Sequence, residues 1–527
     1  MHNNLPFILA MIAAIVLLNT LAGKLRIAYP IVLIVAGLLV GFFPGLPMVK
    51  IDPDLIFFIF LPPLLFEASW NISFKEMKKW WRIIGSFAFL VVFFSALSVA
   101  VVAHHFLPGF TLALGFLLGG IVSPPDAVST GAITKFVKIP KTTSAILEGE
   151  SLLNDASSLI IFRFALIAVG TGQFFLQQAA LSFLWMVIGG VGIGLFLGWI
   201  FIQAHKRLPL DAPSNIALTL IEPYFMYWLA EQLHCSGVLA VVSGGLFLSA
   251  KRLIFFNSSS RIQSSSVWES FVFILNGIVF LIIGLELPEI VDGLRQKGIP
   301  LTTAISSGVL VTGVLIASRI ISSYAALLAT YIFRPAVIPH ARSNRRRWLM
   351  PLLLGWTGMR GVVSLAAALA IPITLENGSD FPQRNLILFI TFVVIFLTLV
   401  LQGLTLPVLI TRSGLFEGVV EEQPEEDTRR KIKHGLKAHI YQFLKSRHVT
   451  ASSDQAIIEK LLFQWEERAK ASDDSWMSEN TKAIFLELLE VQRQYLTELN
   501  KDPLIDETLI RQQLYQIDLE EERLKII

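Results

Sequence analysis

Long apolar segments recur along the chain from Leu5 to about residue 410, and short polar or basic segments separate them. A membrane-spanning helix needs about 20 largely apolar residues, because the hydrocarbon core of a bilayer is about 30 Å thick. Segments of about this length lie near residues 5–22, 27–47, 54–73, 83–105, 109–133, 144–170, 178–203, 214–233, 235–250, 267–288, 302–333, 348–373 and 384–411. The pattern predicts an all-α polytopic membrane protein with about 13 transmembrane helices.

The positions of lysine and arginine between these segments predict the orientation of the chain. Loops after odd-numbered segments hold nineteen Lys and Arg residues, whereas loops after even-numbered segments hold four. Basic loops stay in the cytoplasm, so we expect the N-terminus outside and the C-terminus inside a cell membrane. The basic run at 342–347 is interpreted as an anchor against anionic lipid rather than as a nucleic-acid site.

Composition supports a membrane protein and argues against several classes of enzyme. Of 527 residues, 54% are hydrophobic and 16% charged, and the mean hydropathy of +0.64 lies outside the range of soluble chains. The sequence has no Walker A loop, dinucleotide fingerprint or zinc-protease motif. A single cysteine, Cys235, excludes an intramolecular disulfide and any cysteine-based metal site. We therefore expect a protein that is not an enzyme and that uses no cofactor.

The chain changes character at about residue 412. Residues 412–527 carry 23 acidic and 17 basic side chains, a net charge of −6, whereas residues 1–411 have a net charge of +9. Amphipathic patterns such as AIIEKLLFQWEERAK and TKAIFLELLEVQRQYLTEL predict helices in the acidic region. We therefore expect a transmembrane transport domain over 1–411 and a helical, regulatory cytoplasmic tail over 412–527.

Two of the predicted spans contain residues that break helices. The fifth contains LGGIVSPPDAVSTGAI, with a double proline at its centre, and the twelfth contains LLLGWTGMRGVVSLAAALAIP, with three glycines. They are seven spans apart, so one would be inverted relative to the other, and spans 1–6 and 8–13 would form two inverted six-helix repeats. Broken helices in transporters free backbone carbonyls and helix ends to face an ion.

Carboxylates near these breaks suggest an ion path. Asp126 follows the double proline, and Asp155 lies in the sixth span directly after Asn154. A carboxylate within a membrane bundle is costly and usually marks an ion or proton pathway. Together with the hydroxyls of Ser123 and Ser151 and freed carbonyls, Asp126 and Asp155 would supply the oxygen ligands of a sodium ion. The alternative, a purely structural ion pair, is disfavoured because neither acid has a basic residue at close helical spacing.

Other charges in the spans are interpreted as supports. Arg319, in the eleventh span, has no obvious aqueous neighbour, and we expect it to form an ion pair with Glu150 that braces the helices near the site. Arg163 and Arg360 are either further braces or charges that shape the field at the site. The sequence does not separate these two roles.

The motifs GESLLNDASSL, SPPDAVST, FLPPLLFEASW, LAEQLHCSGVLAVVSGGL and GMRGVVSLA together resemble the bacterial members of the monovalent cation:proton antiporter-1 family, the sodium/proton exchangers. The resemblance extends over about 400 residues. It implies thirteen spans, a homodimer in membrane lipid, and sodium/proton antiport by alternating access that serves pH homeostasis. It also implies that Asp155 binds cation and proton in turn, with Asn154, Asp126, Ser123 and Ser151 around it and the Glu150–Arg319 pair beside it.

Several functional alternatives remain open at this point. Sodium, with lithium as a second substrate, is the expected cation, and potassium/proton antiport is the main alternative. Because Asn154 cannot take up a proton, we expect electroneutral exchange of one cation for one proton. An intramembrane aspartyl protease that uses Asp126 and Asp155 is a more distant alternative, since its glycine-rich sequence context is absent. A channel is disfavoured because the sequence lacks a repeated pore lining.

Overall fold

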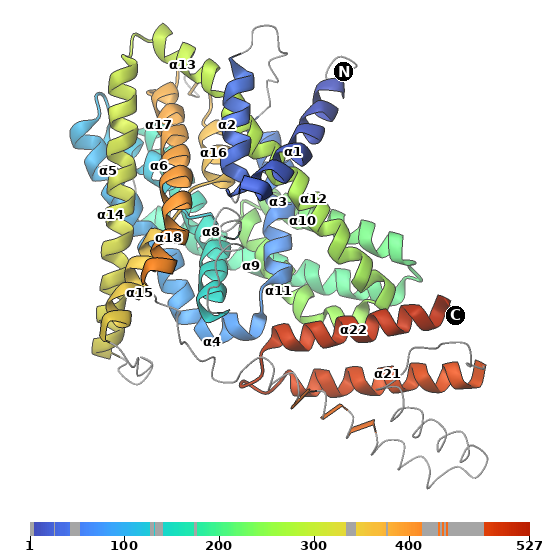
Figure 1. Cartoon of the computed structure of the whole chain (residues 1–527). Helices are drawn as coiled ribbons and strands as arrows, with labels where there is room; N and C mark the ends of the chain where they lie inside the picture. The colour runs from blue at the N-terminus through green and yellow to red at the C-terminus, as the bar shows by residue number, and fades with distance from the viewer. Residues whose placement is uncertain are drawn as a thin grey trace. The chain divides into compact units, whose positions relative to one another are not determined.

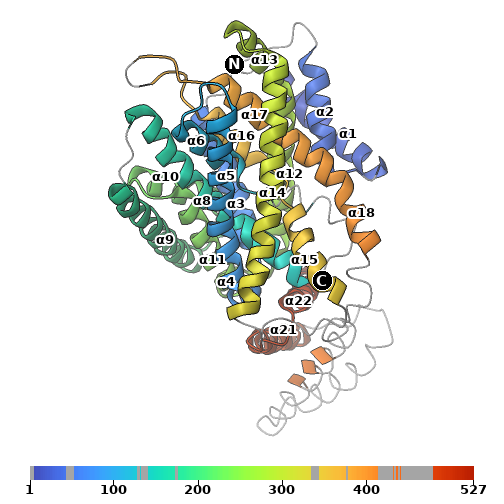
Figure 2. The ribbon, with the colours of Figure 1, turned by 90° about the vertical axis from the view of Figure 1, so that its left-hand side faces the viewer.

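The computed structural model describes residues 5–25, 27–42, 53–126, 131, 141–172, 176–333, 344–375, 378–413, 431–432, 435–436, 439–440 and 479–526. These residues form helices and no strand, apart from one isolated bridge between Thr374 and Asp380 (Figures 1 and 2). The helices before the acidic tail are α1 (Leu5–Leu25), α2 (Tyr29–Gly41), α3 (Pro53–Asn71), α4 (Phe74–Gly85), α5 (Val92–Phe106), α6 (Leu112–Val122), α8 (Lys141–Thr171), α9 (Leu176–Arg207), α10 (Ala212–Gln232), α11 (Gly237–Phe255), α12 (Ser258–Leu285), α13 (Leu287–Gln296), α14 (Leu301–Phe333), α15 (Asn344–Trp356), α16 (Val362–Leu369), α17 (Arg384–Leu397) and α18 (Gly403–Ser413). Two π-helical segments, Ser86–Val91 and Thr398–Gln402, join α4 to α5 and α17 to α18.

The predicted all-α, multi-pass class is confirmed. Each of the thirteen predicted apolar segments coincides with helix over all or part of its length. Within the described residues, eight helical stretches are long and apolar enough to cross a membrane, and two apolar helices, α2 and α6, are shorter. The longest stretches combine several elements, as in Phe74–Phe106, Ser258–Gln296 and Arg384–Ser413.

Helices are interrupted at the two places that the sequence marked. Helix α6 ends at Val122 and is followed by non-helical residues as far as Asp126. Helix α15 ends at Trp356, and α16 begins only at Val362. The remainder of the predicted fifth span, apart from residue 131, lies outside the described residues.

Glycines let α6 approach both of its neighbours closely. A Cβ at Gly115 or Gly119 would lie 2.6 or 2.5 Å from a carbonyl oxygen of α5. A Cβ at Gly120 would lie 2.9 Å from the backbone nitrogen of Phe162 in α8. Small residues at this spacing allow membrane helices to pack backbone to backbone. The interrupted end of α6 is thereby held against α8, the helix that carries Asp155.

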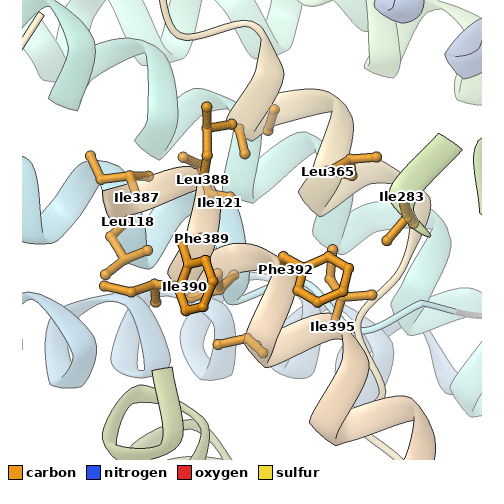
Figure 3. Packing of buried hydrophobic residues seen from close by; sticks show 14 of the residues in the cluster. Leu118, Ile121, Ile283, Leu365, Ile387, Leu388, Phe389, Ile390, Phe392 and Ile395 are labelled. Atoms are coloured by element: carbon orange, nitrogen blue, oxygen red, sulfur yellow. The ribbon is translucent and has the colours of Figure 1, made fainter. Parts of the chain in front are cut away.

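The largest apolar core surrounds the interrupted helices. It includes Leu118 and Ile121 of α6, Leu365 of α16 and Ile390 of α17, all of them buried (Figure 3). Helices α5, α6, α14 and α17 lie side by side in both views of the chain (Figures 1 and 2). Dense packing of this kind has low compressibility, so it fixes the backbone on both sides of each interruption.

The chain divides into two compact units. The first comprises Met1–Pro209, Ala217–Phe255 and Val267–Glu417, and the second comprises Leu210–Ile216, Phe256–Ser266 and Gly418–Ile527. In the second unit, α21 (Glu479–Leu499) and α22 (Glu507–Ile526) pack against each other. Their buried side chains include Phe485, Leu489 and Leu496 from α21 and Ile510 and Ile517 from α22. The predicted helix AIIEKLLFQWEERAK lies outside the described residues.

Candidate functional site: two interrupted helices beside a buried carboxylate

Backbone and side-chain hydrogen bonds link the two interruptions directly. The amide of Asp126, just after α6, donates to the carbonyl oxygen of Met359, between α15 and α16, at 2.7 Å. In return, the guanidinium of Arg360 donates from Nε to the carbonyl oxygen of Val122 at 2.6 Å and from Nη1 to that of Gly358. Arg360 therefore satisfies carbonyls that the helix breaks leave without their usual partners.

The glycines of the GMRG motif are explained by what lies against them. A Cβ at Gly361 would overlap the Asp126 carboxylate, and a Cβ at Gly358 would overlap the side chain of Arg319. Any other residue at either position would displace one of these charged groups. The glycines of the motif thus allow the side chains of Asp126 and Arg319 to pack directly against the backbone at the second interruption.

Polar side chains of α8 complete the junction. Ser151 Oγ and Asn154 Nδ2 both donate to the carbonyl oxygen of Pro125, at 3.3 and 3.2 Å. These donors lie about one helical turn apart, so they present one polar face of α8 to the interruption after α6. The structure thus brings Ser151 and Asn154, two of the predicted site residues, to the double-proline segment, and their role in binding a cation stays a prediction.

Asp155 lies on the next position of α8 and is 8% exposed. Its carboxylate forms no hydrogen bond or ion pair with another described residue. Among the described residues, Ser123 Oγ at the end of α6 and Asn154 Oδ1 on α8 are buried without a hydrogen-bond partner. Buried polar atoms normally have partners, so these oxygens are available to a bound ion. Carboxylate, hydroxyl and amide oxygens are the ligands that hard cations such as sodium prefer.

Glu150 and Arg319 form a bidentate ion pair beside this junction. Arg319 Nη1 and Nη2 donate to the two carboxylate oxygens of Glu150 at 2.7 and 2.9 Å. The side chains are only 3% and 1% exposed, respectively. The pair ties α14 to α8 one residue before Ser151, and it is the contact that the sequence predicted for these two residues.

Comparison with known proteins identifies the family. Residues 9–412 match the transmembrane sodium/hydrogen exchanger family. The chain belongs to the sodium/hydrogen exchanger family. The resemblance seen in the motifs is thereby confirmed.

Relatives of this exchanger include an uncharacterized Na(+)/H(+) exchanger of Mycobacterium tuberculosis, which is 31% identical over 537 aligned positions that cover 99% of this chain and 96% of the relative. A sodium, potassium, lithium and rubidium/H(+) antiporter of Bacillus subtilis is 32% identical over 73% of this chain and 58% of its own length. Among solved structures, the sodium proton antiporter MjNhaP1 of Methanocaldococcus jannaschii aligns with a TM-score of 0.60 at 18% identity, covering 78% of this chain and 98% of that one. The last comparison supports the fold.

Arg163 of the exchanger lies away from the junction. It forms an ion pair with Glu231 of α10, and the side chains are 39% and 27% exposed. Glu231 also accepts a hydrogen bond at 3.1 Å from the amide of Gly237, at the start of α11. Arg163 is eight residues after Asp155 in the same helix, which corresponds to about 12 Å along the axis. Of the two roles left open for Arg163, this geometry supports the brace.

Thr398 is a member of the junction that the sequence did not reveal. Its hydroxyl accepts a hydrogen bond at 3.1 Å from the amide of Arg360 and donates at 2.8 Å to the carbonyl of Val394. Thr398 begins the π-helical segment of the α17–α18 stretch. Single-turn π-helices are often found at functional sites, but a lone threonine in an apolar run gives no signal from which this contact could be predicted.

Proposed function

We propose that the exchanger moves sodium against protons across the membrane by alternating access, with Asp155 as the shared binding group. Family membership makes the chain a cation/proton antiporter, which is a transporter and not an enzyme. This excludes the aspartyl protease alternative. The observation that carries the proposal is a set of buried oxygens that have no partner among the described residues: the Asp155 carboxylate, Ser123 Oγ and Asn154 Oδ1.

Competition at one carboxylate is sufficient for coupled exchange. An ionised Asp155 in a low-dielectric site is strongly disfavoured unless a cation or a proton neutralises it. The empty, charged carrier therefore has a high barrier to reorientation, while either loaded form can cross. A cation that binds displaces the proton, and a proton that binds displaces the cation. Each crossing therefore carries either a cation or a proton.

The surrounding residues have supporting roles in this proposal. Asp126, Ser123, Ser151 and freed backbone carbonyls would contribute oxygens to the cation, and Asn154 would orient Asp155 without titrating. Arg360 would hold the end of α6, and hence the approach to Asp126, through its hydrogen bond to Val122. The Glu150–Arg319 pair would keep α8 and α14 in register while the site changes access.

We expect electroneutral exchange of one sodium ion for one proton. An amide at position 154 adds no second titrating acid, so the cation-loaded and proton-loaded carriers have equal charge. Asp126 keeps a constant charge in this scheme. Two coupled acids that both titrate would permit other stoichiometries.

The test is proton movement in proteoliposomes that contain the purified protein and a pH-sensitive dye. Sodium and lithium chloride should drive proton movement, choline chloride should not, and the sodium-driven rate should be the same at zero and at an imposed inside-negative potential. Moving one uncompensated charge is worth about 2.3 kcal/mol per 100 mV. A clear dependence of sodium/proton exchange on voltage would therefore contradict the one-for-one stoichiometry.

Potassium/proton antiport is the second candidate, since the relative from Bacillus subtilis carries potassium, lithium and rubidium beside sodium in its name. The same vesicles decide between the candidates by the cation that drives the fastest proton movement. A potassium rate well above the sodium rate would replace sodium as the substrate and leave the role of Asp155 unchanged.

The wider architecture is also part of the proposal. We propose thirteen spans in the cell membrane, two inverted six-helix repeats, an external N-terminus, a cytoplasmic tail from about residue 412 and a homodimer. The excess of basic residues in one set of loops supports the orientation. The equivalent interruptions of the α6 segment and of α15–α16 support the repeats.

We further propose that the tail regulates transport. In the second compact unit, Arg261 of α12 donates to both carboxylate oxygens of Asp518 in α22, at 2.9 and 2.6 Å. Arg493 of α21 contacts Asp518 at 2.9 Å and Glu521 at 2.7 Å. Burial lowers the pKa of Arg493, but the carboxylates of Glu521, Glu490 and Asp518 outweigh this effect and raise it above its ordinary value. The network joins the tail helices to the first turn of a helix that continues as a predicted span.

Deleting the tail after Gly414 should leave sodium/proton exchange in place and change its rate or its response to pH, because every proposed ligand precedes residue 412. Asp518→Asn should reproduce part of this change, since it removes the carboxylate charge that Arg261 and Arg493 share. Glu498→Gln is the matched control, as it removes an exposed charge that pairs locally with Lys501. A truncated protein that inserts normally but shows no exchange at any pH would refute a purely regulatory tail.

A further inference from the structure

Helix α4 extends a membrane-spanning helix beyond the length that the hydrocarbon requires. The continuous helical stretch Phe74–Phe106 has 33 residues, which at 1.5 Å per residue is about 50 Å long. The hydrocarbon core is about 30 Å thick. The excess of about 13 residues matches α4, whose sequence FKEMKKWWRIIG is far more polar than the rest of the stretch. The apolar residues that follow α4, from Ser86 to Phe106, are therefore long enough to cross the hydrocarbon core without α4.

One face of α4 combines positive charge with exposed aromatic rings. We define the α4 face as Phe74, Lys78, Lys79, Trp81 and Arg82, all of which are exposed. Phe74 is 45% and Trp81 is 61% exposed. None of the three basic side chains forms an ion pair with a described residue, and Arg82 instead lies over the Trp81 ring. This combination is typical of helices that lie in the interface of an anionic membrane.

The acidic residue of α4 does not cancel this charge. Glu76 accepts a hydrogen bond at 3.1 Å from the indole of Trp80, which is only partly exposed. Glu76 also occupies the first turn, where its backbone amide is capped by Ser73 at 3.2 Å and a negative charge complements the helix dipole. The α4 face itself is thus left with three positive charges.

The opposite side of α4 packs on the helix that carries the proposed ion site. Ile84 is fully buried, and a Cβ at Gly149 of α8 would lie 2.7 Å from Ile84 Cδ1. Gly149 directly precedes Glu150, and the π-helical segment after α4 also contacts α8. A displacement of α4 must therefore shift α8 or lose this close packing.

We propose that the α4 face binds the headgroups of anionic phospholipids, and that binding accelerates exchange by fixing α4 against α8. The acceleration of exchange rests on the proposed function, whereas the binding of lipid headgroups does not. Each interfacial Lys or Arg contributes about fivefold to binding an anionic surface, so loss of all three should weaken lipid binding by about a hundredfold.

The test compares the variant Lys78→Gln/Lys79→Gln/Arg82→Gln with Lys206→Gln/Arg207→Gln/Lys251→Gln. The second variant is a matched control, because it removes the same charge from exposed residues at the ends of α9 and α11. Thermal unfolding of the full chain in neutral detergent is measured with phosphatidylglycerol, phosphatidylcholine or inorganic phosphate. Phosphatidylglycerol should raise the Tm of the wild type and the control but not that of the α4 variant.

Exchange is then measured in vesicles of phosphatidylcholine with and without phosphatidylglycerol. The anionic lipid should increase the rate severalfold for the wild type and the control and leave the α4 variant unchanged. Equal lipid stabilisation of all three proteins, or stabilisation by inorganic phosphate alone, would overturn the proposed lipid site. Lipid binding without a change in rate would overturn the coupling to α8, whereas absence of cation-driven exchange in every vesicle would refute the proposed function and leave the binding result standing.

Discussion

Asp155→Asn is expected to abolish cation-driven proton movement and to leave the folded protein intact. Asparagine has nearly the same shape, but it carries no charge to bind a cation and takes up no proton near neutral pH. Folding should survive because the Asp155 carboxylate forms no hydrogen bond or ion pair with another described residue. Removing a charge that is buried without a partner relieves a desolvation cost rather than breaking a contact.

The measurement is the rate of sodium-driven proton movement in proteoliposomes, normalised to the amount of inserted protein. The variant should match protein-free vesicles, while its Tm in detergent should equal or exceed that of the wild type. Asp292→Asn is the control, because Asp292 is 67% exposed and forms a local ion pair at 3.7 Å with Arg295. Exchange by Asp155→Asn at the wild-type rate would show that the Asp155 carboxylate does not bind the transported ions.

Asp126→Asn should differ from Asp155→Asn in its effect on stability and not in its effect on transport. It should also stop exchange, because it removes a charge that the cation needs. The Asp126 carboxylate packs against Gly361, and its amide holds the second interruption, so this substitution also risks a change in local structure. A pair of variants that differ in stability but agree in lost transport would support both carboxylates as ligands.

The membrane-spanning helices could be predicted from sequence because bilayer thickness sets the length of the apolar runs. The two interruptions were equally visible, since a double proline and clustered glycines are strong helix-breaking signals in any context. The boundary of the fourth span was less visible. The apolar pattern predicts it at 83–105, whereas the helix begins at Phe74, because the basic residues of α4 interrupt the apolar run while the helix continues.

Contacts between distant helices were predictable only where chemistry left few choices. Arg319 lies in an apolar span, so it required an acid, and Glu150 was a suitable buried one. The guanidinium of Arg360 was not predictable in this way, because its hydrogen bonds go to the backbone carbonyls of Val122 and Gly358. Carbonyls occur at every residue, and only the three-dimensional positions of the helix breaks show which of them lack partners.

Breaking the Glu150–Arg319 pair is expected to reduce stability more than intrinsic transport. Arg319→Ala would leave the buried Glu150 carboxylate without its two donors, and Glu150→Gln would leave a buried guanidinium without a counter-charge. Loss of one partner of a buried ion pair typically costs about 3–5 kcal/mol in the free energy of unfolding. The cost should be large here because both side chains are almost fully buried and Arg319 Nε has no hydrogen-bond partner in the part of the chain that the structure describes.

A double-mutant cycle tests the brace without relying on either single variant. The Tm in detergent and the exchange rate per inserted molecule are measured for Glu150→Gln, Arg319→Met and the two together. The double variant should recover much of the stability lost by each single one, because no unpaired charge remains in the interior. Its exchange rate per folded molecule should stay within a few-fold of the wild type, since Asp155, Asn154 and Asp126 are unchanged. A double variant that is as stable as the wild type and yet fails to exchange would instead make Glu150 a direct participant in ion binding, because lost transport could then no longer be attributed to a weakened helix bundle.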